Sequence, residues 1–233
     1  IFFFFWYVSV PVCLAGYILR KKIYIHESDS VWGLANNIIW KLASKIFYTF
    51  PNEKIDWVKH ILTWQILNPE LFQGVVDDFV EYDENWEEIY KENEKLEVLV
   101  IAGSQGSTII FENLISVINN LIDVDFTVIL WEKNLWYKEK FSKFNNVKTY
   151  DFVTQNELKN IYKNTDIAIT RAWATSLWEL YYFGVHSIII PLSTSAQNHQ
   201  FHNAQYFKEN FQSEVLDENN QLISIFVASI KTS

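Results

Sequence analysis

The sequence predicts an α/β protein whose strands form parallel sheets with helices packed on both faces. Short apolar runs typical of buried strands alternate with segments whose apolar residues recur at helical spacing. From residue 96 onward this alternation is regular, which is typical of a doubly wound, Rossmann-like sheet. Ligands of such sheets bind at the carboxyl ends of the strands, so the loops that follow the strands are the candidate functional segments.

The composition limits the class of protein. The chain has 233 residues, of which 49% are apolar, so it can form one large or two small domains with a real core. A net charge of -9 argues against a nucleic-acid groove, which needs a basic face. The single cysteine, Cys13, permits no internal disulfide and fits a reducing cytoplasm. The first residue is Ile1 rather than Met, and we expect a fragment of a longer protein.

The first segment, residues 1–70, is predicted to be half of a Rossmann-like domain. An apolar stretch, residues 1–19, precedes Arg20, Lys21 and Lys22, and this pattern also occurs in membrane anchors with a positive flank. We favour a strand and a helix, because the strand–helix alternation continues after it and Pro11 suits a first helical turn. The expected elements are a strand at 1–5, a helix at 9–20, a strand at 22–26, a helix at 33–44, and strands at 45–50 and 58–63.

The second segment is predicted to be a complete Rossmann-like domain, residues 96–233. An acidic stretch, residues 71–95, is interpreted as a solvated linker helix between the two domains. Beyond it we expect strands at 96–102, 126–130, 147–150, 166–170 and 187–190, with helices between them.

Three loops are expected to meet at the carboxyl edge of this second sheet. Residues 102–106 (AGSQG) join a strand to a helix predicted at 107–122, a geometry that aims backbone N–H groups and a positive dipole end at a phosphate. The loops 171–179 and 191–200 follow the strands at 166–170 and 187–190. Together they present hydroxyls, amides and one carboxylate, which suits a nucleotide-sugar pocket where the carboxylate takes the ribose hydroxyls.

The ordered motifs of the chain resemble the donor-site motifs of the MurG family, the UDP-N-acetylglucosamine transferases that make lipid II for peptidoglycan. The matching segments are 103–106 (GSQG), 171–179 (RAWATSLWE) and 198–200 (NHQ) with Asn203 and Ala204, and upstream 7–11 (YVSVP), 26–29 (HESD), 33–36 (GLAN) and 63–71 (TWQILNPEL). The resemblance spans nearly the whole chain. It implies a GT-B fold, in which two Rossmann-like doubly wound domains face each other across a cleft, with the first domain incomplete here.

The resemblance also implies an activity. It is the inverting transfer of N-acetylglucosamine from UDP-N-acetylglucosamine to the C4 hydroxyl of lipid I, the undecaprenyl-diphospho-muramoyl pentapeptide. The implied partners are these two substrates and the cytoplasmic face of the bacterial inner membrane, where the family acts as a peripheral protein. No nucleic acid, cofactor or metal is implied. Another GT-B UDP-sugar enzyme (a glycolipid glucosyltransferase or a UDP-sugar epimerase) and a non-catalytic nucleotide-sugar-binding remnant remain alternatives.

The site residues that the resemblance implies come mostly from the second segment. The substrate-binding set is Gly103, Ser104, Gln105, Gly106, Val153, Ala174, Thr175, Ser176, Leu177, Glu179, His199 and Gln200. Asp29 and Asn68 are added from the first segment, at positions where the family usually has Asn and a phosphate-contacting Arg. The family's glycine-rich loop with a candidate catalytic base lies upstream of residue 1 and its closing C-terminal helix is missing. The base is therefore unassigned, with His26 a weak candidate, and we expect that the fragment can bind donor without catalysing transfer.

Several of these residues have a purely structural interpretation as well. Glu179 could form a helix capping box with Ser176, as Thr154 and Glu157 are expected to do. His26 could be a satisfied core histidine. The spacing of His199 and His202 is also that of two metal ligands, but without a third ligand we interpret them as surface or pocket-lining residues.

Tryptophan stands at three positions where the family has glycine: Trp6, Trp64 and Trp173. Ten Trp against six Gly is abnormal for an α/β chain, and an indole at position 173 replaces a residue chosen for close backbone approach. We hypothesise that UGA codons meaning glycine were translated as tryptophan. The alternative is true substitution in a divergent or decayed homologue.

Overall fold

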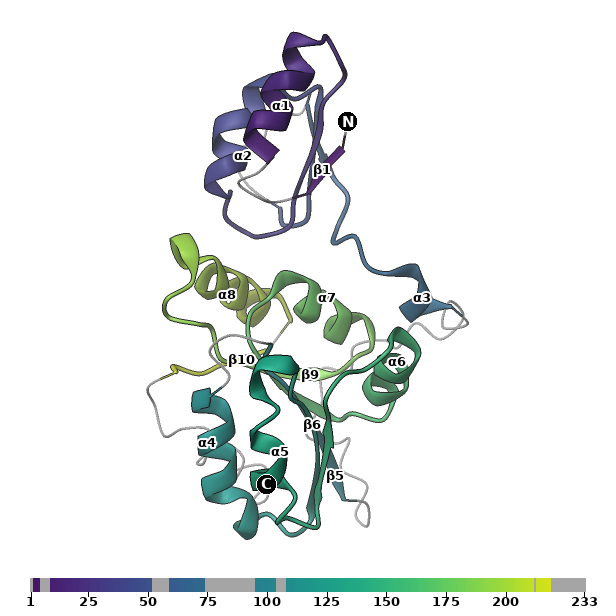
Figure 1. Cartoon of the computed structure of the whole chain (residues 1–233), viewed down its shortest axis with the longest axis vertical. Coiled ribbons are helices and arrows are strands. Elements are labelled where there is room, and N and C mark those ends of the chain that lie inside the picture. The colour runs from purple at the N-terminus through teal and green to yellow at the C-terminus, as the bar shows by residue number, and fades with distance from the viewer. Residues whose placement is uncertain are drawn as a thin grey trace.

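The computed structural model describes residues 2–4, 9–51, 59–73, 95–103, 108–211 and 213–218. Its strands form two parallel sheets, one of four strands in the order β1-β2-β3-β4 and one of six in the order β10-β9-β8-β5-β6-β7. Figure 1 shows each sheet in its own body, with α1 and α2 on the first and α4 to α8 on the second. The predicted parallel α/β architecture is confirmed.

The first sheet follows the predicted order of strands and helices. Its strands are β1 (Phe2–Phe4), β2 (Tyr24–Glu27), β3 (Lys45–Tyr48) and β4 (His60–Leu62), and its helices are α1 (Ser9–Ile18) and α2 (Leu34–Ile39), which continues into a 3-10 turn, η1 (Trp40–Leu42). Strand β1 pairs in parallel with β2, which confirms the strand-and-helix interpretation of the apolar start. Cys13, Ile25, Ile39 and Ile46 pack together as the core of this body.

The second sheet has the strand order that creates a ligand-binding edge. Its strands are β5 (Leu96–Ile101), β6 (Val124–Ile129), β7 (Val147–Tyr150), β8 (Ile167–Thr170), β9 (His186–Ile189) and β10 (Glu214–Val215). From β5 the chain proceeds to β6 and β7 on one side, and then to β8, β9 and β10 on the other. The order therefore reverses between β5 and β8, and the carboxyl ends of these two strands form the topological switch point at which such sheets bind ligands.

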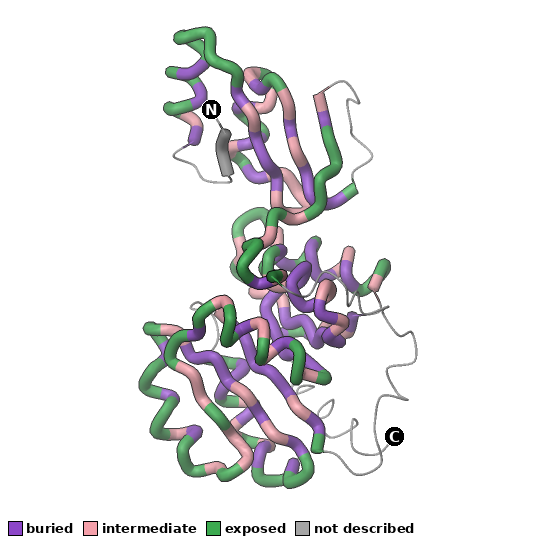
Figure 2. The backbone as a smooth tube through the Cα atoms, turned by 90° about the vertical axis from the view of Figure 1, so that its right-hand side faces the viewer, coloured by how far each residue is buried: buried purple, intermediate pink, exposed green. Residues whose placement is uncertain are grey.

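Helices cover both faces of this sheet. They are α4 (Thr108–Val117), α5 (Tyr137–Phe141), α6 (Gln155–Lys163), α7 (Ala174–Tyr182) and α8 (His199–Phe211), with 3-10 turns η3 (Ile118–Asn120), η4 (Glu132–Asn134) and η5 (Ala196–Asn198). Because strand side chains alternate, Val98 and Val100 of β5 pack with residues of α4 and α5, whereas Leu99 and Ile101 pack with residues of α6 and α7. In Figure 2 buried segments run through the interior of this body.

Two features differ from the sequence prediction or extend it. A short helix, α3 (Pro69–Phe72), spans the predicted domain boundary at 70/71, and its Leu71 is fully buried in the core beside α6 and α7. The domain boundaries themselves stay predictions. The expected linker helix falls on residues 74–94, which lie outside the described residues. Within the described ranges, no helix is both long and apolar enough to cross a membrane.

The two bodies meet through loops at the carboxyl ends of the first sheet. Phe50, two residues beyond β3, packs with Ala172, Leu177 and Phe207 of the second body. Figure 1 shows α7 and α8 on the side of the second body that faces the first. The loop after β3 in the first body therefore contacts α7, α8 and the loop that precedes α7 in the second body.

Candidate functional site

The loop after β5 begins with a backbone turn at the switch point. Gly103 has φ of +69°, a left-handed conformation that favours glycine. The side-chain amide of Asn134 donates to the Gly103 carbonyl at 3.5 Å, which links this loop to the turn that follows β6. Ser104, Gln105 and Gly106 lie outside the described residues, so their contacts with a ligand stay predictions.

Trp173 lies directly against this glycine. The indole Nε1 is 3.1 Å from the point where a Cβ atom on Gly103 would stand, and 46% of the Trp173 surface is exposed. Position 173 is also the N-cap of α7, where tryptophan supplies no capping hydrogen bond. The indole therefore occupies space at the mouth of the predicted phosphate loop.

Helix α7 presents its amino terminus to the same edge. The first N–H groups of a helix have no partner within it, and together with the helix dipole they favour an anion. The Thr175 hydroxyl accepts a hydrogen bond from the Gln65 amide at 3.0 Å, so the loop after β4 touches this terminus. Leu177 is fully buried and Ala174 nearly so, so both can serve a ligand only through the main chain.

Glu179 lies in the second turn of α7, and the alternative interpretation, a capping box with Ser176, is wrong. The helix begins at Ala174 with Trp173 as N-cap, so Ser176 is not the N-cap residue and Glu179 lies three positions beyond the place of a capping-box carboxylate. The Glu179 carboxylate is buried and accepts a hydrogen bond from the Tyr162 hydroxyl at 3.0 Å. Burial raises the pKa of Glu179, an effect that the Tyr162 hydrogen bond opposes.

The capping box of α6, by contrast, is confirmed. The Thr154 hydroxyl accepts from the Glu157 N–H, and the Glu157 carboxylate accepts from the Thr154 N–H. The preceding residue, Val153, is buried in the core, so only its main chain can contact a ligand.

The first turn of α8, which packs against the loop after β9, contributes a buried amide to the site. The Gln200 Oε1 accepts from the Leu192 N–H at 2.9 Å, which fixes the side chain. Its Nε2 is also buried, and within the described part of the chain it has no hydrogen-bond partner. A buried donor without a partner is costly, and a ligand hydroxyl in this place would satisfy it.

Asn203 bridges the two bodies beside this amide. It is fully buried, it donates to Asp29 at 2.8 Å and to the Ala172 carbonyl at 3.1 Å, and it accepts from the Ser30 N–H at 2.8 Å. Asp29 also lies 3.6 Å from His199. Burial raises the pKa of Asp29, while Asn203 and His199 act in the opposite direction. Asp29 thus ties the first sheet to α8.

A buried ion pair links the two loops of the second body. Arg171 is fully buried, and its guanidinium contacts Glu218 at 2.6 Å and donates to the Ile190 carbonyl at 3.0 Å. Glu218 also accepts from the N–H and the hydroxyl of Ser193. Burial raises the pKa of Glu218, but the Ser193 hydrogen bonds and the Arg171 charge outweigh it and hold that pKa below its usual value.

The remaining candidates of the first body have structural partners. His26 is fully buried, with its ring nitrogens 3.2 Å from the Ser28 hydroxyl and 3.4 Å from the Thr49 hydroxyl, a geometry that favours the core-histidine interpretation. The exposed Asn68 accepts from the Glu70 N–H and caps α3. Neither geometry directs the side chain at a ligand.

The sequence analysis did not identify Glu27 as a buried titratable residue. Its carboxylate is 1% exposed and accepts from the Asn36 amide at 2.8 Å and the Gly33 N–H at 3.0 Å. Burial raises its pKa to about 7. A carboxylate directly after His26, at the carboxyl end of the strand 24–27, is the signal that could have identified it.

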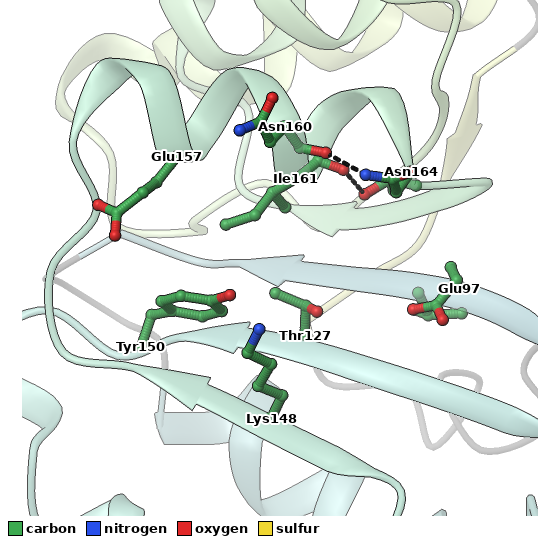
Figure 3. Close-up of a pocket in the computed structure, with 10 residues that line it drawn as sticks. Glu97, Thr127, Lys148, Tyr150, Glu157, Asn160, Ile161 and Asn164 are labelled. Carbon is green, nitrogen blue, oxygen red and sulfur yellow. Dashed lines mark hydrogen bonds between the residues drawn. The ribbon is translucent and has the colours of Figure 1, made fainter.

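Two cavities lie near these elements. One of about 400 Å³ is bordered by Leu192, Ser193, Asn198 and Glu218, next to the loop after β9. Another, of about 410 Å³, lies between α6 and strands β5 to β7, where Lys148, Tyr150 and Glu157 line it (Figure 3). None of the predicted site residues lines the second cavity. Across the described ranges, no group of three His, Cys, Asp or Glu is arranged to hold a metal ion.

Two parallel sheets whose strand ends face each other across such loops define the GT-B class of glycosyltransferase. Residues 97–233 match the glycosyltransferase family 28 C-terminal domain, and the chain belongs to that family. A solved structure of MurG from Acinetobacter baumannii superposes with a TM-score of 0.73 at 19% identity, covering 98% of this chain and 63% of that one. A putative UDP-N-acetylglucosamine 2-epimerase from Listeria monocytogenes gives 0.64 at 12%, covering 97% of this chain and 63% of the other.

Two curated relatives are named UDP-N-acetylglucosamine–N-acetylmuramyl-(pentapeptide) pyrophosphoryl-undecaprenol N-acetylglucosamine transferase. The Sulfurihydrogenibium protein is 30% identical over 91% of this chain and 57% of its own length. The Clostridium tetani protein is 32% identical over 95% of this chain and 60% of its own length. The chain thus spans less than two thirds of the relatives that it matches.

Proposed function

We propose that this chain is part of an enzyme that transfers N-acetylglucosamine from UDP-N-acetylglucosamine to lipid I, forming lipid II. The observation that carries the proposal is the Nε2 of Gln200, which is buried and has no partner among the described residues, three residues before Asn203, which donates to the Ala172 carbonyl just ahead of α7. A hydrogen-bond donor beside an anion-binding helix end suits a sugar attached to a diphosphate. The two curated relatives described above are named for these substrates.

In this proposal each loop contacts one part of the donor. The N–H groups at the start of α7 and the segment 103–106 bind the diphosphate and stabilise the charge that develops on it as the sugar leaves. Glu179 accepts the ribose hydroxyls, with Tyr162 holding the carboxylate in place. Gln200 donates to a hydroxyl of the sugar. The base that takes the acceptor proton is not assigned to any described residue.

The lipid acceptor requires contact with a membrane surface, and we assign that contact to α1. Its exposed side chains include Val12, Leu14, Tyr17 and Ile18, and the exposed Arg20 to Lys22 follow directly. Apolar side chains beside cations are typical of helices that lie on anionic lipid surfaces. The proposed location is therefore the cytoplasmic face of the bacterial inner membrane, as a peripheral protein.

Calorimetric titration of the full chain with UDP and with UDP-N-acetylglucosamine tests the donor site. We expect Gln200→Ala to weaken binding of the nucleotide sugar about tenfold while leaving UDP nearly unchanged, because in this proposal Gln200 contacts the sugar and not the nucleotide. Gln205→Ala, on the same helix, serves as the control. Equal weakening of both ligands, or no binding of either, would overturn the proposed donor geometry.

A further inference from the structure

Two tryptophans have backbone conformations that belong to glycine. Trp131 has φ of 60° and ψ of 158°, a region that residues other than glycine essentially do not occupy. Trp64 has φ of 60° as well, which is a genuine outlier for a bulky side chain. The steric clash of the Cβ atom with its own backbone strains both positions.

The side chain of Trp131 packs in part against the core beside α6 and α7, but its polar atom is not satisfied there. Its indole Nε1 is buried and, within the described residues, has no hydrogen-bond partner. Trp136, five residues later, is an ordinary tryptophan by comparison, with φ of -64° and 54% exposure. A tryptophan retained for its contacts would be expected to satisfy its N–H.

The strained positions share one place in the fold. Trp64 follows β4 and Trp131 follows β6, each two residues beyond the carboxyl end of its strand. Trp173, the third residue after β8, touches Gly103. The turn at 131 is tied to that same glycine, because the Asn134 N–H donates to the Trp131 carbonyl and the Asn134 side chain donates to the Gly103 carbonyl.

We propose that positions 64 and 131 are glycine in the functional protein, so that the turns at the carboxyl ends of β4 and β6 present bare main chain beside α7 and Gly103. The misread-codon hypothesis was based on three positions, 6, 64 and 173, at which the family has glycine. Position 131 is added here because of its own backbone angles, without any comparison with the family. Glycine at these turns relieves the strain and lets the main chain approach a ligand closely. The assignment of glycine at these two positions is independent of the proposed function. Only the identity of the ligand that would approach the turns rests on the proposed function.

Thermal melts of four variants of the full chain test the backbone argument. Glycine is ordinarily less stabilising than alanine, but at positive φ the order reverses. We expect Trp131→Gly to melt about 2–4 °C above Trp131→Ala, and Trp136→Gly to melt below Trp136→Ala. The glycine and alanine variants at one position both lack the indole. The difference between their melting temperatures therefore reports only the backbone preference at that position. If glycine melts below alanine at 131 as it does at 136, the proposal is wrong.

The gene provides the second test, because the codons at 64 and 131 should be UGA. A UGG codon at either position would overturn the proposal. Titration of Trp131→Gly with UDP separates this proposal from the proposed function. If glycine melts above alanine but UDP does not bind, the glycine assignment stands and the proposed nucleotide site fails.

Discussion

Replacing Asn203 by alanine tests whether one side chain holds the two bodies together. Asn203→Ala removes two neutral hydrogen bonds, to Ala172 and Ser30, and one to the carboxylate of Asp29. At about 0.5–1.5 kcal/mol for each neutral bond and 1.5–3 kcal/mol for the charged one, the expected loss is roughly 2.5–6 kcal/mol. In a chain of this size that lowers the melting temperature by roughly 5–24 °C.

The assay is thermal unfolding followed by circular dichroism, with Asn210→Ala as the matched control. Asn210 lies on the same helix, is exposed, and donates only to the Tyr206 carbonyl within the helix. Because Asn203 stabilises the charged form of Asp29, whose folded pKa is raised, the loss should shrink as the pH falls and Asp29 becomes protonated. A loss no larger than that of Asn210→Ala at neutral pH would refute the reasoning.

Three further predictions follow from the site. The pKa of Glu27 is raised from 4.5 to about 7, so stability should decline by about 3 kcal/mol as the pH rises through that interval, and melts of Glu27→Gln should lack this decline. Glu179→Gln should weaken UDP binding about tenfold while Tyr162→Phe weakens it less, and calorimetry giving equal losses would remove the carboxylate from the ribose contact. Trp173→Gly should raise affinity for UDP-N-acetylglucosamine without lowering the melting temperature, whereas weaker binding with a lower melting temperature would mark the indole as native.

The sequence predicted the strands of the second body well because most of them, such as β5 and β8, are largely apolar runs between polar segments. The strand at 147–150 has the predicted bounds, and β6 begins two residues earlier than expected, at Val124. The helix expected at 107–122 is regular only over 108–117 and then tightens into a 3-10 turn, a local change that apolar spacing does not report. Strand β10 was missed because it has only two residues and no alternation to detect.

The sequence predicted which loops form the candidate site, but it did not predict the side-chain contacts within them. The three loops follow β5, β8 and β9, as parallel topology requires. The carboxylate partner of Arg171 lies 47 residues away in the chain, and two partners of Asn203, Asp29 and Ser30, lie in the other sheet body, so no local pattern could reveal them. The left-handed backbone at Trp131 contradicts the residue type itself and could only be found in the structure.

The ion pair between Arg171 and Glu218 sets a limit on where the chain can be shortened. A chain cut after Val215 would keep α8 and every strand that the described residues form, yet it would leave a fully buried guanidinium without its carboxylate. Losing one partner of such a pair typically costs about 3–5 kcal/mol, a large part of the stability of an ordinary domain. The Ser193 loop would lose two hydrogen bonds at the same time. Any minimal version of this domain for crystallisation or ligand screening therefore has to extend at least through residue 218.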